Sequence, residues 1–152
     1  MKSMWHVLFP RIDTTRGDIP ILLLRTVAGA AFLIHGWKKI QDPVGWIGPG
    51  SSIPGVLQAL AALSEFGGGG AWILGLLTPL VSAGILSTMS VALWMHISVW
   101  GDPFVGSPSS YELPLLYAII AILLLRMGPG RFSIDAILSR QLTPKKEDEQ
   151  LV

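Results

Sequence analysis

Residues 19–40 read IPILLLRTVAGAAFLIHGWKKI, and this stretch decides the fold. The run is long and apolar enough to cross about 30 Å of hydrocarbon at roughly 1.5 Å per helical residue. It also carries four basic side chains, Arg25, His35, Lys38 and Lys39. Polar groups within a membrane span usually mark a lined cavity, a partner or a substrate path. The stretch therefore predicts a membrane-spanning helix whose polar side chains meet groups from other spans.

The composition of the whole chain agrees with a membrane protein. Of its 152 residues, 51% are hydrophobic and only 14% are charged, whereas soluble domains carry roughly 25% charged residues. The net charge of +1 gives no case for nucleic-acid binding. The chain has no cysteine, which excludes disulfides, thiolate metal sites and dithiol redox chemistry. The length fits one compact helical unit.

Three further apolar runs follow, at about 54–77, 80–99 and 109–127. Together with the first they predict an all-α, integral membrane four-helix bundle, in which the short link at Thr78 makes the second and third spans an antiparallel hairpin. Four glycines at 67–70 either let a neighbouring helix approach closely or unwind the second span locally.

The ends of these runs carry helix-start signals. Pro54 fits the first turn of the second span, and Thr78 is positioned to cap the third. Ser109 and Glu112 have the spacing of a capping box for the fourth span.

The chain divides into four parts: an N-terminal cytoplasmic or interfacial segment (1–18), the bundle (19–127), a short interfacial helix (128–140) and a mobile charged tail (141–152). Ser133 is the expected cap of the interfacial helix. Its apolar side would carry Ile134, Ile137 and Leu138, and its polar side Asp135 and Arg140.

Lysines and arginines predict the orientation. Eight of them fall on the side of both termini and two, Lys38 and Lys39, on the other. This asymmetry predicts both termini in the cytoplasm.

Helical rise places His35 and His96 at one level, about 24 Å from the cytoplasmic edge, with Glu65 about one turn lower. Lys38 shares a helix face with His35. These four side chains are expected to line one pocket that opens toward the outer leaflet and takes a planar quinone-like or aromatic ligand. Arg25 would lie below the pocket and reach Glu65 or a hydroxyl.

The candidate catalytic residues are Glu65, His35 and His96. The candidate ligand-binding residues are Lys38, Arg25, Trp100, Glu112 and Tyr117.

Each candidate also has a structural interpretation. Glu65 would then only neutralise Arg25 or Lys38, and the histidines would be hydrogen-bonded interior residues. Glu112 would be a capping acid. Lysines near the end of a span can extend to headgroups, which is the better interpretation for Lys39. For Trp100 the simpler interpretation is a place in the aromatic belt at the membrane interface. No metal site is expected, because no single helix carries paired ligands at metal-binding spacing.

Three segments carry a family resemblance: LLLRTVAGAAFLIHGWKKI (22–40), EFGGGGAWILGLLTPL (65–80) and GPGRFSIDAIL (128–138). They closely resemble the DoxX family of small four-helix bacterial membrane proteins, over roughly residues 21–138. The resemblance implies a bundle in the bacterial cytoplasmic (inner) membrane. It also implies an association with quinone-linked sulfur oxidation, detoxification of hydroquinone-type compounds or oxidative-stress complexes. The residues on family motif positions are Arg25, His35, Gly36, Lys38, Glu65, Gly68 and Gly69.

Two functions are compatible with these observations. The first is a quinone- or quinol-interacting subunit of a membrane redox system. Because no motif for flavin, haem or iron–sulfur binding is present, a partner redox subunit or soluble donor would supply the electrons, and quinone is the one cofactor considered. The alternative is a non-catalytic subunit that assembles or anchors a membrane complex. The expected contacts are the lipid bilayer and either a partner subunit or further copies of the chain.

Overall fold

The computed structural model describes residues 15–142, and this part of the chain is helical without strands. The predictions for residues 1–14 and 143–152 lie outside it. The elements are α2 (Thr15–Gln41), α3 (Gly55–Leu74), α4 (Thr78–Trp94), the π-helix η1 (Met95–Val99), α5 (Glu112–Met127) and α6 (Ile134–Leu142). The prediction of an all-α fold is confirmed.

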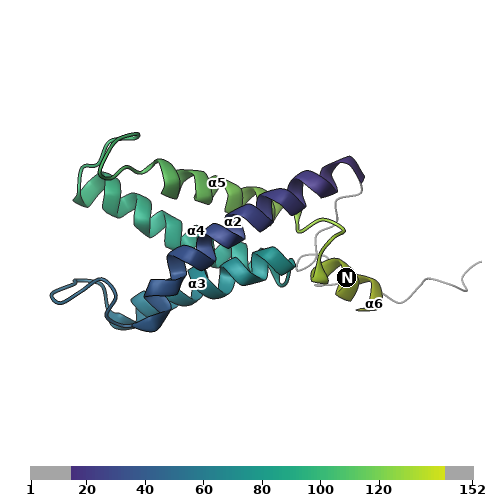
Figure 1. The fold of residues 1–152 in the computed structure, drawn as a ribbon, viewed down its shortest axis with the longest axis horizontal. Coiled ribbons are helices and arrows are strands. Elements are labelled where there is room, and N and C mark those ends of the chain that lie inside the picture. Colours follow the sequence, from purple (N-terminus) through teal and green to yellow (C-terminus); the bar gives the residue numbers. More distant parts are fainter. Residues whose placement is uncertain (1–14, 143–152) are drawn as a thin grey trace, which may run out of the picture.

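The four long helices form two antiparallel hairpins, α2–α3 and α4–α5, joined through contacts between α3 and α4 (Figure 1). Two segments, Gly17–Gln41 and Thr78–Val99, are long and apolar enough to cross a membrane. The helices α3 and α5 pack beside them and have 20 and 16 residues. This is the expected four-helix membrane bundle, with α6 at the end where α2 begins.

The four glycines of α3 lie inside a continuous α-helix. The alternative that the second span unwinds there is therefore wrong. A Cβ on Gly69 would stand 2.6 Å from the carbonyl oxygen of Gly29 on α2. A Cβ on Gly68 would meet Val81 and Ile85 of α4, both at 3.2 Å. Neighbouring glycines thus let α3 approach two different helices, which confirms the prediction of close packing.

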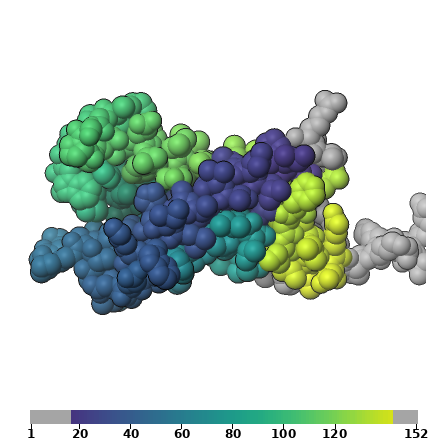
Figure 2. All heavy atoms as spheres, in the orientation of Figure 1, coloured from purple at the N-terminus to yellow at the C-terminus, as the bar shows by residue number. Residues whose placement is uncertain are grey.

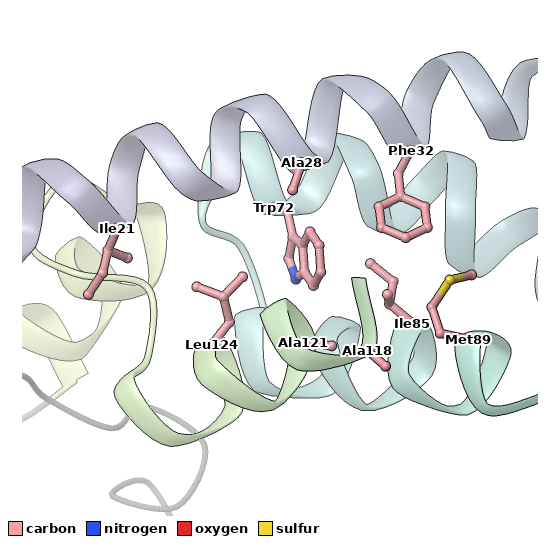
Figure 3. Packing of buried hydrophobic residues seen from close by; sticks show 9 residues of the cluster. All are labelled: Ile21, Ala28, Phe32, Trp72, Ile85, Met89, Ala118, Ala121 and Leu124. Atoms are coloured by element: carbon pink, nitrogen blue, oxygen red, sulfur yellow. The ribbon is translucent and has the colours of Figure 1, made fainter. Parts of the chain in front are cut away.

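The apolar core joins all four helices but fills only part of their length (Figure 3). Its last buried apolar side chain along α2 is Phe32 and along α4 is Met89, while its first along α5 is Ala118. The ring of Phe32 packs 4.6 Å from that of Tyr117 and edge-on to Trp72. Beyond this level the two hairpins diverge, and Figure 2 shows a notch between their tips.

Several helix starts differ from the prediction. The helix α2 begins at Thr15 and contains Pro20, which costs little near an N-terminus because the first N–H groups have no intrahelical partner. Pro54 is the residue before α3 rather than part of its first turn. Thr78 is the first residue of α4, and Leu77, in the left-handed region at φ 47°, precedes it.

The prediction of a capping box at the start of α5 is also wrong. Tyr111 precedes α5 and makes no capping bond through its side chain. The hydroxyl of Ser109 instead donates to Asp102 Oδ1 at 2.6 Å. In a capping box the Ser109 oxygen would accept from a backbone N–H of the first helical turn, whereas here the hydroxyl donates to a carboxylate.

The cap of α6 is confirmed, because the Ala136 N–H donates to Ser133 Oγ at 3.1 Å. The assignment of Asp135 to a solvent-facing polar side is wrong, since this residue is only 1% exposed. Its carboxylate accepts hydrogen bonds from the backbone N–H groups of Leu77 and Thr78, at 2.7 and 2.8 Å. These groups lie at the positive end of the α4 dipole, which favours a carboxylate there.

Candidate functional site

Arg25 points toward the end of the bundle where α6 lies, away from Glu65. It is 1% exposed, and it donates to the backbone oxygens of Trp72 and Ile73 at 3.0 and 2.9 Å and to that of Phe132. The first two belong to the last turn of α3, whose unpaired carbonyls form the negative end of the helix dipole. The guanidinium therefore caps α3 and ties it to the segment before α6. Neither Glu65 nor a Tyr117 hydroxyl is among its hydrogen-bond partners.

Glu65 pairs with Lys39, not with Arg25 or Lys38. The Lys39 Nζ lies 2.6 Å from Glu65 Oε1, with the carboxylate side chain 4% and the lysine side chain 24% exposed. The suggestion that Lys39 extends to the headgroups is thus corrected, since its ammonium turns inward across the α2–α3 interface. This pair links α2 and α3 near the loop that joins them.

The loop between α2 and α3 covers this ion pair. The Trp46 ring lies over Lys39, with Nζ 4.3 Å from the ring centroid. The Trp46 Nε1–H donates to the Gln58 backbone oxygen at 3.1 Å, and the Gln58 side chain bonds the backbone of Ile47 and Ile53. Gln58 thereby fixes the loop so that the indole shields the ammonium, an arrangement in which a cation–π contact is favourable.

His35 and Lys38 do not enter this interior. Both are exposed, and the Nδ1 of His35 lies 2.9 Å from the backbone oxygen of Ala31 on its own helix. His35 therefore faces outward from α2 rather than toward Glu65.

His96 occupies the other hairpin and has partners of its own. Its Nδ1 lies 2.7 Å from Asp102 Oδ2, and Ser109 donates to the other oxygen of the same carboxylate. Trp100 packs edge-on against the imidazole at 4.8 Å between ring centroids. The hydrogen bonds from Ser109 and His96 hold the pKa of the Asp102 carboxyl below its ordinary value. The structure thus brings His96 and Trp100 together, but not His96 and His35.

The remaining candidates lie on α5. Tyr117 is partly buried against the core through Phe32. Glu112 is exposed in the first turn of the helix, where a negative charge is favourable. The structure gives neither a contact with the Lys39–Glu65 pair.

Sequence reasoning missed Lys39, although a signal was present. Helical spacing puts Phe32, Gly36 and Lys39 on one stripe of α2, and a Cβ on Gly36 would stand 2.5 Å from the backbone of Phe66 on α3. Counting from the glycine that must face α3 would have selected Lys39. Depth along the helix, used alone, cannot separate it from Lys38.

Asp102 was missed because a loop carboxylate six residues from a histidine has no helical spacing to mark it. Asp18 was missed for a similar reason. Its carboxylate accepts from the Arg131 N–H at 2.9 Å and pairs with the Arg131 guanidinium, a contact between opposite ends of the chain.

Comparison with known proteins agrees with this architecture. A family model described as DoxX matches residues 21–97. The chain is also 32% identical over 130 residues to the inner membrane protein YqjF of Escherichia coli (strain K12), a match covering 82% of this chain and 95% of that protein. This chain belongs to the DoxX family. No solved structure matches it.

The matched DoxX region contains the main features of the α2–α3 hairpin. Residues 21–97 include Arg25, the Lys39–Glu65 pair, the glycines and His96. The segment around Phe132 lies beyond the family match, yet it supplies one of the three backbone acceptors of Arg25. The family resemblance expected from the sequence is thus confirmed, and with it the assignment as a membrane protein.

Proposed function

We propose that this DoxX-family chain is a quinone- or quinol-interacting subunit of a membrane redox system, and that the ligand enters the notch between the two hairpins. The observation that carries the proposal is the end of the core at Phe32, Met89 and Ala118. Beyond these residues the two hairpins separate, which leaves a notch between their tips.

The chemistry of the notch suits a planar apolar ligand. Phe32 and Tyr117 lie at its base, and Leu93 of α4 is packed against the core from the same side as Met89. Aromatic rings favour offset or edge contacts with another ring. A quinone headgroup would therefore rest on this aromatic base with its tail among the lipids.

His96 supplies a hydrogen-bonding group at the rim. Met89, Leu93 and His96 follow at spacings of four and three residues, the spacing of one helix face. When Nδ1 donates to Asp102, the other ring nitrogen, Nε2, carries the lone pair and can accept a hydrogen bond. His96 would then hold a quinol hydroxyl, and a partner protein would exchange the electrons. His96 thus keeps a ligand-contacting role, while Glu65 stabilises the α2–α3 hairpin.

Photoaffinity labelling tests the proposal. The full-length protein in lipid nanodiscs is irradiated with an azidoquinone, and labelled peptides are identified by mass spectrometry. We expect labelling within residues 85–97 and 113–118 that excess unlabelled quinone suppresses. Leu93→Trp should fill the notch and reduce labelling about tenfold, whereas Leu63→Trp, on an exposed part of α3, should not. Uniform labelling of lipid-facing residues that excess quinone does not suppress would contradict the proposal.

A second candidate function is assembly or anchoring of a membrane complex. It is favoured by the outer face of α2, where His35, Trp37 and Lys38 are all exposed within one turn. Tryptophan is enriched in protein interfaces relative to the rest of the surface. Purification in mild detergent distinguishes the two functions: a subunit that co-purifies and is lost in a Trp37→Ala variant, without bound quinone, would favour assembly.

We also propose that the chain lies in the bacterial inner membrane with both termini in the cytoplasm. The support is the charge asymmetry of eight against two and the similarity to an inner membrane protein. Single cysteines at Gly48 and Gln150, in a chain that has no cysteine of its own, should react with an impermeant maleimide from opposite sides. Reaction of both from one side would contradict this topology.

A further inference from the structure

The helix α6 turns the carboxylate of Asp135 toward the protein and the side chain of Ile137 away from it. Asp135 is 1% exposed, whereas Ile137, two residues later on the opposite side of the helix, is 55% exposed. Phe132, just before the helix, is 58% exposed. A surface helix of a soluble protein shows the reverse arrangement.

Hydrogen bonds fix this rotational setting. The Asp135 carboxylate caps α4 through Leu77 and Thr78, and the Asp135 N–H donates to the Gly75 oxygen at 2.9 Å. The backbone oxygen of Phe132 accepts from Arg25. Because the segment is held on both sides of Ser133, the side chains of Phe132 and Ile137 cannot turn inward without breaking these bonds.

At the end of the bundle where α6 lies, the exposed charged side chains of the described residues are basic. Its carboxylates, Asp18 and Asp135, are buried. Arg126, in the last turn of α5, and Arg140, three residues after Ile137 on the same face of α6, are exposed. Apolar side chains beside exposed arginines are the pattern of helices that lie in a membrane interface.

We propose that α6 and the turn before it form a binding surface for anionic phospholipids. Phe132 and Ile137 enter the boundary between headgroups and acyl chains, and Arg126 and Arg140 contact the lipid phosphates. The bilayer is the occupant because the same chain spans it and α6 lies against the ends of α2, α3 and α4. Arginine pairs with phosphate through two parallel N–H donors, which gives preference for anionic headgroups. This surface is independent of the proposed quinone notch, which lies at the opposite end of the bundle.

The depth of α6 is tested with spin labels on single cysteines, again using the absence of native cysteine. Phe132→Cys and Ile137→Cys, labelled and placed in nanodiscs, should be relaxed more by oxygen than by a water-soluble nickel chelate. Pro49→Cys, exposed in the loop between α2 and α3, serves as the water-accessible control. Greater nickel accessibility at position 137 would overturn the proposal. So would low accessibility to both reagents, which would mean that protein covers the helix.

Lipid chemistry is tested separately by native mass spectrometry of the full chain with phosphatidylglycerol and phosphatidylcholine. Arg140→Gln should lower retention of phosphatidylglycerol relative to phosphatidylcholine roughly fivefold, the effect of one basic residue near an anionic surface. Lys38→Gln, exposed at the opposite end, should leave that ratio unchanged. Equal retention by the wild type and the Arg140 variant would overturn the assignment of anionic headgroups, whatever the spin labels show.

Discussion

Lys39 and Glu65 form a 2.6 Å ion pair across the interface of α2 and α3, under the ring of Trp46. Removing one member of a buried pair leaves the other charge without compensation. We therefore expect Lys39→Met to destabilise the protein by about 2 kcal/mol, a value reduced from that of fully buried pairs because the lysine is partly exposed. The measurement is the thermal unfolding midpoint in detergent.

Two variants control that experiment. Lys38→Met changes the same residue type one position away, on an exposed site, and should leave the midpoint unchanged within about 0.5 kcal/mol. The double variant Lys39→Met, Glu65→Leu should regain part of the lost stability, because an apolar pair replaces two buried charges. Equal midpoints for the two single lysine variants would show that the pair does not stabilise the hairpin.

Arg25 should not be replaceable by lysine. Its planar guanidinium contacts three backbone oxygens on two segments, Trp72 and Ile73 of α3 and Phe132. A lysine ammonium is a compact charge that cannot match this spread geometry. Arg25→Lys is expected to cost about 2 kcal/mol, the worth of a hydrogen bond to a charged group. Arg126→Lys, at an exposed site, should be near neutral in the same unfolding assay. A result near neutral at both sites would contradict the capping role.

Glycines of the first hairpin should differ sharply in their tolerance of alanine. A Cβ on Gly29 would stand 2.5 Å from the Gly69 oxygen, so Gly29→Ala must push α2 and α3 apart. Gly67 has only a side-chain carbon of Leu63 at 3.4 Å. Alanine there should be neutral, or stabilising by about 0.5 kcal/mol through reduced backbone entropy. Hydrogen exchange of α3 amides measures the difference, and faster exchange in the Gly67 variant than in the Gly29 variant would refute it.

These residues show what sequence could and could not predict. Apolar run length, together with proline and glycine at the ends, predicted the helices and the α3–α4 hairpin, because the bilayer demands continuous hydrogen-bonded spans. The partners of the charges were not predicted, because axial depth says nothing about the direction a side chain takes around the helix. His35 and His96 were predicted to share a level, but they lie on separate hairpins. Lys38 and Lys39 differ by one residue, but Lys38 is exposed and Lys39 pairs with Glu65. Carboxylates such as Asp18 and Asp135 bind backbone N–H groups far along the chain, which local spacing does not encode.

The loop after η1 should loosen in acid. Ser109 and His96 lower the pKa of Asp102, so its folded-state pKa lies below the unfolded value of about 3.9. The stabilisation from this carboxylate is therefore complete above about pH 5 and is lost as the pH falls through the folded-state pKa. The Asp102 amide donates to the His96 oxygen. Its protection factor, which corrects for the slower intrinsic exchange in acid, should therefore fall as the pH is lowered.

Asp102→Asn separates this carboxylate from other titrating groups. The variant should exchange faster at neutral pH and lack the additional acid-dependent loosening. Asp42→Asn, in the loop between α2 and α3, should keep the wild-type profile. A profile unchanged by Asp102→Asn would assign the loosening to another group.

The contact between Arg25 and the oxygen of Phe132 joins residues 107 positions apart. A ribosome adds Phe132 to the chain 107 residues after Arg25. The first span therefore enters the membrane with a guanidinium whose final acceptor does not yet exist. We expect chains that stop before residue 132 to keep a buried guanidinium with one backbone acceptor fewer, and to be less stable for that reason. The segment before α6 thus supplies an acceptor to a guanidinium that was made 107 residues earlier.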